Sequence, residues 1–509
     1  MTKTLPLLHD KITYSVAKEQ EGNILHKLGY YRQSIKFFSH LLKNRILIQA
    51  LAAHHLGLNA DACHVSDPGD WLHGSFNVCI PISINQGKRS VNRAMIRFPL
   101  PHRIGEAFRP GNADEKLRCE AGAYVWLQEN CPTVPIPQLY GFGLSGGQSF
   151  TAIENTSLAS RFCQYIRRLI LGSLGYKLPS RYVRTKCDLL NTLGTGYLLI
   201  EYVDEERGSM LSNTWNDRRH DTKLRKNLFR SLSRILLTIA KVPVSTIGSF
   251  KIDDNGYLTL SNRPLVCEIQ KFENEEIPVE IPRDFTYSNA DSYIVDILTF
   301  HDSRLSHQLN GATDEKDCIY QMSALTMMKS LFPRFFQRRL RGGPFVFSLT
   351  DLHQSNILVD QDWNVTSLID LEWSCSRPIE MLHPPQWLTS QAIDEINVSD
   401  YDKLRIEYME ILKQEEMRFY SKSTISDIMQ RGWERGTFWF SLALNSPTGL
   451  FSIFYDHIQP RFAKGHIDDK HFFRILMSYW TENTWEFINK KKGHKTDYDQ
   501  RLREAFEER

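Results

Sequence analysis

Hydrophobic and polar residues recur with two different periods along the first part of the chain. Residues 21–58 place apolar side chains near every 3.6th position, which predicts a helical arm that ends at Gly57. Residues 76–84 and 91–98 are instead short β-like runs separated by a polar turn, and they predict a β-hairpin. The chain therefore changes from a helical to a β-rich pattern near residue 60.

A second helix and a mostly helical region follow this hairpin. Residues 116–129 return to helical spacing, and the prolines of residues 131–137 end that helix because proline lacks the backbone donor. Residues 196–203 are apolar nearly throughout, which predicts a buried strand. After Gly208 the spacing is mainly helical, apart from a short β-like patch and one clear hairpin near Asn356.

An insertion at residues 157–187 contains basic residues and no acidic one. Two interpretations stay open for it: a solvated basic excursion, or a face that contacts anions or a membrane. Its basic residues are Arg161, Arg167, Arg168, Lys177, Arg181, Arg184 and Lys186.

Composition excludes several classes of protein. The 509 residues are 41% hydrophobic and 24% charged, which is typical of a folded globular chain with more than one lobe. The formal net charge is only +3, so we expect no general affinity for nucleic acid. Nine scattered cysteines without a C-x-x-C pair argue against a zinc site or a disulfide framework. We find neither a spanning apolar segment nor a signal-type leader, and we expect no integral membrane segment and a cytoplasmic location.

The candidate chemistry lies in residues 345–373, FVFSLTDLHQSNILVDQDWNVTSLIDLEW. Two apolar runs flank a polar turn at 360–364 and predict a β-hairpin. Its open end brings Asn356 and Asp370 together, and two hard oxygen donors without His or Cys suit Mg²⁺ better than Zn²⁺. Asp351, five residues before Asn356, is placed to accept a proton from an attacking hydroxyl.

The spacing D-x-H-x-x-N, followed by a hairpin and I-D-x-E, resembles the aminoglycoside phosphotransferase and choline kinase-like family, especially its fungal branch of phosphotransferase-domain proteins. The resemblance covers roughly residues 60–390. It implies that Asp351 positions or deprotonates the acceptor, and that Asn356 and Asp370 hold the metal. Leu349 and Thr350 depart from the family, which often writes H-G before the Asp.

The resemblance also implies a phosphate site in the β-rich region. Gly74 and Ser75 would form the turn whose amides cover the nucleotide phosphates, although an ordinary hairpin turn has the same sequence. Arg97 aligns with the phosphate-binding lysine of related kinases, and Glu120 is its expected ion partner. The alternative for Arg97 is an edge-strand arginine that pairs with any surface acid.

The remaining candidates are weaker. Met95 would cover the adenine base, and Glu201 and Val203 belong to the segment whose backbone would bind the adenine edge, yet such residues also match an ordinary core strand. Glu372, two residues after Asp370, has either a secondary metal role or a structural one. The family builds its acceptor pocket from helices of the larger lobe. Some aromatic residues of 433–462 are therefore candidates to line it, although most are expected in the core.

These features predict an α+β, two-lobed protein-kinase-like fold with a small β-rich N-lobe and a larger helical C-lobe. Residues 1–60 would be a helical extension and 61–205 the nucleotide-binding small lobe with the insertion at 157–187. Residues 206–509 would be the large lobe, with the catalytic loop at 345–373 and C-terminal helices.

The predicted activity is transfer of the γ-phosphoryl group of ATP, with Mg²⁺, to a hydroxyl of a small-molecule acceptor. The alternative is a catalytically silent, kinase-like nucleotide-binding or scaffold protein, because Arg97 takes the lysine position and Thr350 alters the loop. A protein kinase is disfavoured, since Asp370-Leu371-Glu372 replaces D-F-G and no A-P-E follows.

Overall fold

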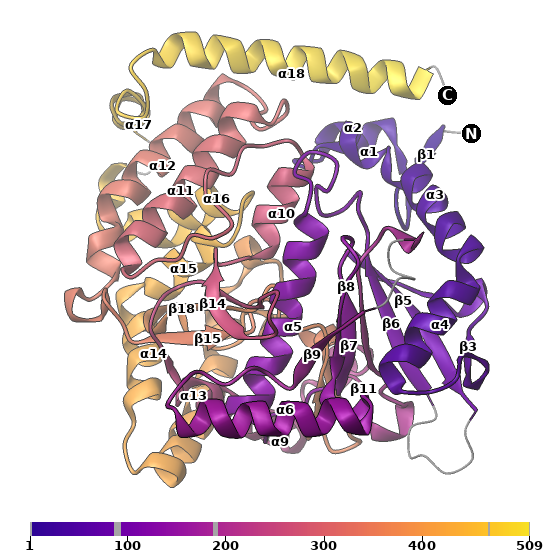
Figure 1. Cartoon of the computed structure of the whole chain (residues 1–509). Helices are drawn as coiled ribbons and strands as arrows, with labels where there is room; N and C mark the ends of the chain where they lie inside the picture. The colour runs from indigo at the N-terminus through magenta and orange to yellow at the C-terminus, as the bar shows by residue number, and fades with distance from the viewer. Residues whose placement is uncertain (1–2, 86–92, 187–191, 467–468, 508–509) are drawn as a thin grey trace.

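An antiparallel sheet forms the centre of the first half of the chain (Figure 1). The computed structural model describes residues 3–85, 93–186, 192–466 and 469–507. The strand order is β3-β5-β6-β10-β7-β8-β9, with β4 paired to β5. The strands are β3 (Cys63–Val65), β4 (Leu72–His73), β5 (Asn77–Ile84), β6 (Arg93–Pro99), β7 (Leu139–Gly143), β8 (Gln148–Ala152), β9 (Tyr182–Lys186) and β10 (Tyr197–Glu201).

The two strands predicted for the hairpin, β5 and β6, are antiparallel neighbours, with Cys79 opposite Arg97. Residues 86–92, which hold the predicted turn and the start of its second strand, lie outside the described residues. Because successive side chains of a strand point to opposite faces, Ile96 joins the core on one face of the sheet and Met95 the core on the other.

Helices cover both faces of this sheet. The helical arm is divided into α2 (Ile24–Lys27), α3 (Tyr30–Lys43) and α4 (Arg45–Leu56), and α4 packs on one face. The predicted continuous helix is wrong at two points, Leu28–Gly29 and Asn44. The side-chain amide of Asn44 donates to the carbonyl oxygen of His40 at 2.9 Å and competes with the helical pattern. Gly57 ends α4 with a φ of 64°, as expected for a left-handed C-cap.

The other face of the sheet is covered by α5 (Asn112–Asn130), which is buried along nearly its whole length. It begins four residues before the predicted start and ends where Pro132 follows. The insertion contains α6 (Leu158–Ser173) and the edge strand β9, while Cys187 lies outside the described residues. Helix α5 therefore stands between the sheet and the rest of the chain.

The second half of the chain is mainly helical but contains more strand than the sequence predicts. Its helices are α8 (Trp215–Arg218), α9 (Thr222–Ala240), α10 (Cys267–Asn274), α11 (Ala290–His307), α12 (Glu315–Phe335), α13 (Val398–Tyr420), α14 (Thr424–Arg435), α15 (Thr437–Leu444), α16 (Leu450–Ile453), α17 (Lys470–Met477) and α18 (Thr484–Glu507). Three small sheets join β11 (Ser209–Met210) with β16 (Ile357–Val359) and β17 (Val365–Leu368), β12 (Pro243–Val244) with β15 (Phe345–Ser348) and β18 (Cys375–Pro378), and β13 (Ser249–Ile252) with β14 (Leu258–Asn262). Most of these strands have two to four residues, which is too short for a clear two-residue period.

The two ends of the chain pack against each other (Figure 1). The first elements are β1 (Thr4–Pro6), β2 (Lys11–Thr13) and α1 (Tyr14–Glu19), and their apolar side chains share a core with the C-terminal helix α18. The hydroxyl of Tyr498 on α18 accepts a hydrogen bond from the backbone of Ile24 at 2.9 Å. The first residues are therefore tied to the last helix.

Two expectations drawn from composition can be compared with the described residues. The eight cysteines within the described ranges are free thiols. Over those same ranges, no helix combines the length and the apolar character that a bilayer crossing requires.

Candidate active site

The hairpin β16–β17 holds the predicted metal ligands at one end. Its strands are antiparallel, with Ile357 opposite Leu368, and Asp360 caps the turn by accepting hydrogen bonds from two turn amides at 2.8 and 3.0 Å. At the open end, the backbone amide of Ile369 donates to the carbonyl of Asn356 at 3.0 Å. Asn356 and Asp370 therefore leave two adjacent strands at the same edge.

Asn356 also fixes the loop that carries Asp351. Its buried side-chain amide donates to the carbonyl oxygen of Asp351 at 2.9 Å, which leaves its Oδ1 atom free to face a cation. His353 braces the same loop, because its Nδ1 atom accepts from the amide of Ser355 at 3.3 Å. The loop is thus held by side chains on both sides of Asp351.

The carboxylate of Asp351 is half-buried beside a second acid. Burial raises the pKa of Asp351 to about 6; His353 opposes this shift, and the charge of Asp370 adds to it. A carboxyl with this pKa is ionised at neutral pH and is still a better proton acceptor than an ordinary aspartate. Asp351 therefore has the charge and the basicity that a general base needs.

An ion-pair cluster joins this hairpin to the sheet. Arg97 on β6 donates from Nη1 to Glu120 on α5 at 2.7 Å and from Nη2 to Asp370 at 2.6 Å. The three side chains come from elements that are far apart in the sequence. Those of Arg97 and Glu120 are almost fully buried. The Nε atom of Arg97 is buried without a hydrogen-bond partner among the described residues.

Two members of this cluster, Lys116 and Asn77, were not predicted from the sequence. Lys116 on α5 contacts the carboxylate of Glu372 and donates to the side-chain carbonyl of Asn77 at 2.8 Å. Asn77 in turn donates to Glu372 at 2.9 Å. Lys116 precedes Glu120 by four residues, so the helical period alone places both on one face of α5 and could have found Lys116.

The cluster contains more acids than bases. Burial opposes the ionisation of Asp370, but the cations of Arg97 and Lys116 hold its pKa below the ordinary range. Burial and the neighbouring charge of Asp370 instead raise the pKa of Glu372 to about 7. Glu372 is therefore partly protonated at neutral pH, and Asp370, whose side chain is 28% exposed, is the ionised carboxylate of the cluster that a cation can reach.

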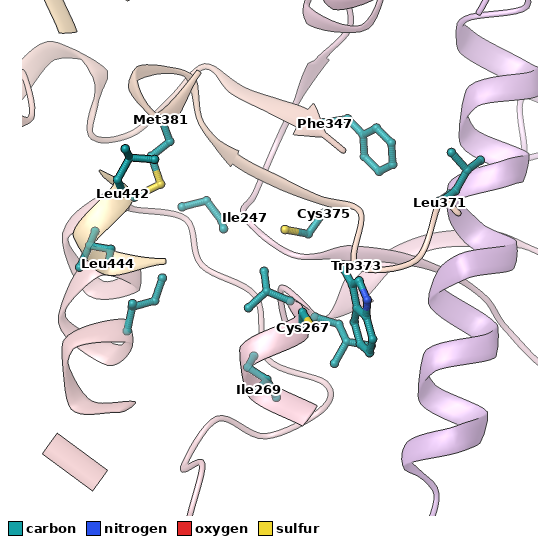
Figure 2. Packing of buried hydrophobic residues seen from close by; sticks show 14 of the residues in the cluster. Ile247, Cys267, Ile269, Phe347, Leu371, Trp373, Cys375, Met381, Leu442 and Leu444 are labelled. Carbon is teal, nitrogen blue, oxygen red and sulfur yellow. The ribbon is translucent and has the colours of Figure 1, made fainter. Parts of the chain in front are cut away.

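The backbone of residues 370–373 directs the polar and the apolar side chains of this segment to different sides. Asp370 and Trp373 adopt left-handed φ angles of 61° and 64°, which residues other than glycine rarely occupy. Figure 2 shows Leu371 and Trp373 among the buried side chains of the core, near Phe347 and Cys375 of β15 and β18. Asp370 and Glu372 consequently face the ion-pair cluster while their neighbours anchor the segment.

The predicted glycine turn lies against this segment. Gly74 connects β4 to β5, and its amide donates to the carbonyl of Asn77 at 2.9 Å. The carbonyl of Ser75 accepts from Arg103 at 2.8 Å, and the ring of Phe76 meets that of Trp373 edge-on at 5.4 Å between centroids. The turn is therefore close to the polar cluster.

The three other nucleotide-binding candidates lie along β6 and β10. Met95 is 8% exposed and stands opposite Ile200 in the neighbouring strand. The side chain of Glu201 pairs with Arg207 and accepts from the amide of Gln138 at 3.1 Å, and Val203 follows at the end of the strand. None of these contacts bears directly on a nucleotide.

A cavity of about 270 Å³ opens beside Asp351. Its wall is largely apolar, with contributions from α9, α10 and the loop after β18. The aromatic residues in it are Phe347, Trp387 and Tyr408. The suggestion that aromatics of residues 433–462 line the acceptor pocket is wrong for this cavity, because Phe438, Trp439, Phe440 and Phe454 pack in the core and only Leu442 and Asn445 of that region reach the wall.

The residues at the hairpin mouth fit Mg²⁺ better than a metal held by protein alone. No group of three His, Cys, Asp or Glu side chains is arranged around a common point in the described ranges. Asn356 and Asp370 offer one amide oxygen and one ionised carboxylate, and Mg²⁺ characteristically takes one or two such ligands together with phosphates and water.

Comparison with known proteins finds likenesses among solved structures but none among family models or curated proteins. No protein-family model and no curated protein matches the chain. A Ralstonia eutropha protein described as a candidate aminoglycoside phosphotransferase is similar over 87% of this chain and 98% of its own, with 13% identity and a TM-score of 0.40. A Plasmodium vivax ethanolamine kinase is similar over 83% of each chain, with 12% identity and a TM-score of 0.35. At these scores neither likeness bears on fold or function, which rest on the geometry above.

Proposed function

We propose that this protein is a small-molecule kinase, which transfers the γ-phosphoryl group of ATP to a hydroxyl of its acceptor. The observation that carries the proposal is the convergence of Asp351, Asn356 and Asp370 at one hairpin mouth, where Asp370 is ion-paired to Arg97 of the sheet. A proton acceptor, a cation site and a phosphate-binding cation are the parts that phosphoryl transfer requires.

Asp351 would act on the acceptor. Its carboxylate would take the proton of the acceptor hydroxyl while the acceptor oxygen forms a bond to the γ-phosphorus and the bond from that phosphorus to the β-γ bridging oxygen breaks. ADP leaves with the electron pair of the broken bond. The hydrogen bond from Asn356 to the carbonyl of Asp351 keeps the base in register with the metal ligands.

The phosphates would lie between the hairpin mouth and the sheet. The unpartnered Nε of Arg97 would donate to a phosphate oxygen that reaches it, and the turn at Gly74 and Ser75 would supply the amide of Ser75, since that of Gly74 donates to the carbonyl of Asn77. Mg²⁺ bound to Asn356 and Asp370 would neutralise phosphate charge as it develops. In this arrangement Glu120 and Lys116 position Arg97 and Glu372 rather than touch the substrate.

The cavity beside Asp351 would hold the acceptor. Its apolar wall favours an alcohol with a substantial hydrophobic body over a polycationic sugar. The charged side chains that line it are Asp351, Glu268 and Arg377, two acids and one base. This excess of one acid disfavours an anionic acceptor and is compatible with a neutral or singly cationic alcohol.

A nucleotide-dependent screen tests the function directly. The purified chain is incubated with Mg-ATP and a panel of apolar and polar alcohols, and ADP formation is measured beside a matched Asp351→Asn preparation. Acceptor-dependent ADP release that the variant lacks is the expected result. If Mg-ATP neither raises the thermal midpoint of the chain nor is consumed with any alcohol, the kinase proposal is wrong.

A silent nucleotide-binding protein is the second candidate. It is favoured by the engagement of both Nη atoms of Arg97 with carboxylates, which a phosphate would have to share or displace. Stabilisation by Mg-ATP without turnover on any acceptor would select this function. Stabilisation that disappears in Asp370→Asn would place the nucleotide at the same hairpin in either case.

A further inference from the structure

Helix α6 has an apolar face that does not pack on the protein. Its side chains at Leu158, Phe162 and Leu169 are 79%, 64% and 54% exposed. Exposed apolar residues recur along the helix with the spacing i, i+4, i+7, i+8, i+11 and i+12, which places them on one side at 3.6 residues per turn. They are Leu158, Phe162, Tyr165, Ile166, Leu169 and Ile170.

The opposite side of α6 holds the helix on the protein through polar groups. Only Gln164, Arg168 and Leu171 are partly buried, and these residues are four and three positions apart. Arg168 donates to the carbonyl of Pro179 from this side, whereas Arg167, at the edge of the apolar face, stays exposed and donates from Nη2 to the hydroxyl of Tyr257 at 3.2 Å. An ordinary surface helix buries its apolar side, so the orientation of α6 is inverted.

The segment around this face carries positive charge. Residues 157–187 contain seven basic residues and no acid. Of the nearby acids, Glu154 pairs with Arg181, and the pKa of Glu129 is raised by burial, an effect that Arg168 and Arg181 oppose. By the helical period, Arg161 and Arg167 flank the apolar face on its two edges.

The dimensions of α6 agree with a helix that lies on a bilayer rather than crosses it. Sixteen residues give a length of about 24 Å, below the roughly 30 Å of a hydrocarbon core. Figure 1 shows α6 as a straight helix across the outside of the molecule. The patch continues beyond its end with the exposed side chains of Leu174 and Tyr176.

We propose that α6 is an interfacial helix that binds the protein to the surface of an anionic lipid bilayer. The apolar face would enter the boundary between headgroups and acyl chains, and the flanking arginines would contact anionic headgroups. A lipid surface supplies both the apolar layer and the negative charge that this segment matches. This proposal is independent of the phosphotransferase activity.

Co-sedimentation of the full chain with vesicles tests the proposal. One set of vesicles contains phosphatidylcholine alone and the other about two parts phosphatidylcholine to one part phosphatidylserine. We expect binding to the anionic set, weakened by added salt. The Phe162→Ser and Leu169→Ser double variant should lower the partition coefficient by about a hundredfold, and the Arg161→Gln and Arg167→Gln double variant by about tenfold.

A matched control removes equally exposed apolar groups elsewhere. Ile475→Ser with Tyr479→Ser replaces one aliphatic and one aromatic side chain on another surface, and it should bind vesicles as the unaltered chain does. An environment-sensitive dye on the exposed thiol of Cys163, attached in a Cys187→Ser background, should shift to shorter wavelength when anionic vesicles are added.

Two results would overturn the proposal. One is equal binding of the unaltered chain and the Phe162→Ser and Leu169→Ser variant, or no binding to either set of vesicles. The other is a concentration-dependent dimer, seen by analytical ultracentrifugation, that this variant abolishes while vesicle binding is absent; the face would then be an interface between two copies of the chain.

Discussion

Helices α5 and α6 differ in which side chains they bury and which they expose. Helix α5 buries Lys116 and Glu120 within a cluster of ion pairs, whereas α6 exposes Phe162 and Leu169 to solvent. Burial of charge costs free energy unless each ion is paired, and exposure of a contiguous apolar face costs free energy unless another surface covers it. A buried helix with charged side chains and a surface helix with an exposed apolar face are both unusual, and each coincides with a proposed binding site.

The two helices also differ in where the partners of their unusual side chains lie. The cluster on α5 has its partners within the chain, so its geometry can be read from distances. The face on α6 has no partner within the described residues, so its chemistry has to be read from the apolar and basic groups it presents.

The largest expected effect is on the candidate active site, with none on α6. With an acceptor alcohol from the screen, Asp351→Asn should lower kcat by about a thousandfold, because an amide cannot take the hydroxyl proton. Affinity for Mg-ATP, measured by calorimetry, should change little, and vesicle binding should not change. Lost nucleotide binding in a normally folded variant would contradict the role given to Asp351.

The ion pairs of α5 should be sensitive to loss of one partner. Lys116→Met removes the closer of two cations from the buried carboxylate of Glu372, with Arg97 left at 3.9 Å, and should lower the free energy of unfolding by about 3–5 kcal/mol. Urea unfolding measures this change. The double variant Lys116→Met with Glu372→Gln should recover part of the loss, and a single variant as stable as the original chain would show that the pair is not buried as described.

The loss of activity at acidic pH should follow the protonation of Asp351. Its pKa of about 6 lies above the ordinary value of about 3.9, and the proposed base works as a carboxylate. Activity expressed as kcat/KM should therefore be constant above this pKa and fall about tenfold per pH unit below it. A limb near pH 4 would mean that Asp351 is more solvated than the structure indicates.

The smallest effect is expected on α6. Leu169→Ala should change the free energy of unfolding by no more than about 0.5 kcal/mol, because the side chain packs little on the protein. Leu117→Ala on α5 is the control, and its burial predicts a loss of about 2–5 kcal/mol. Equal losses for the two variants would show that α6 packs on another part of the chain.

Local features of the sequence were sufficient for the hairpin. A turn of a few residues joins the apolar runs on either side of Asp360, so their pairing and the meeting of Asn356 and Asp370 could be predicted. The end of α4 at Gly57 was equally predictable, since a left-handed C-cap strongly favours glycine. The break at Asn44 was not predicted, because one side-chain hydrogen bond decided it.

Other parts of the site depended on contacts between distant residues. The spacing of Lys116 and Glu120 places them on one helix face, but only the packing of α5 between the sheet and the hairpin segment pairs Lys116 with Glu372. The cavity wall likewise comes from α9, α10 and the loop after β18, which no local period could bring together.

For this protein, the sequence by itself determined the short-range geometry: the hairpin, its polar ends and the amphipathic character of α6. The tertiary structure alone decided which helix face is covered and which carboxylates share a cation. The helical period shows only that one side of a helix is apolar. Whether that side is buried depends on which other segments of the chain pack against it, and they set the free energy gained.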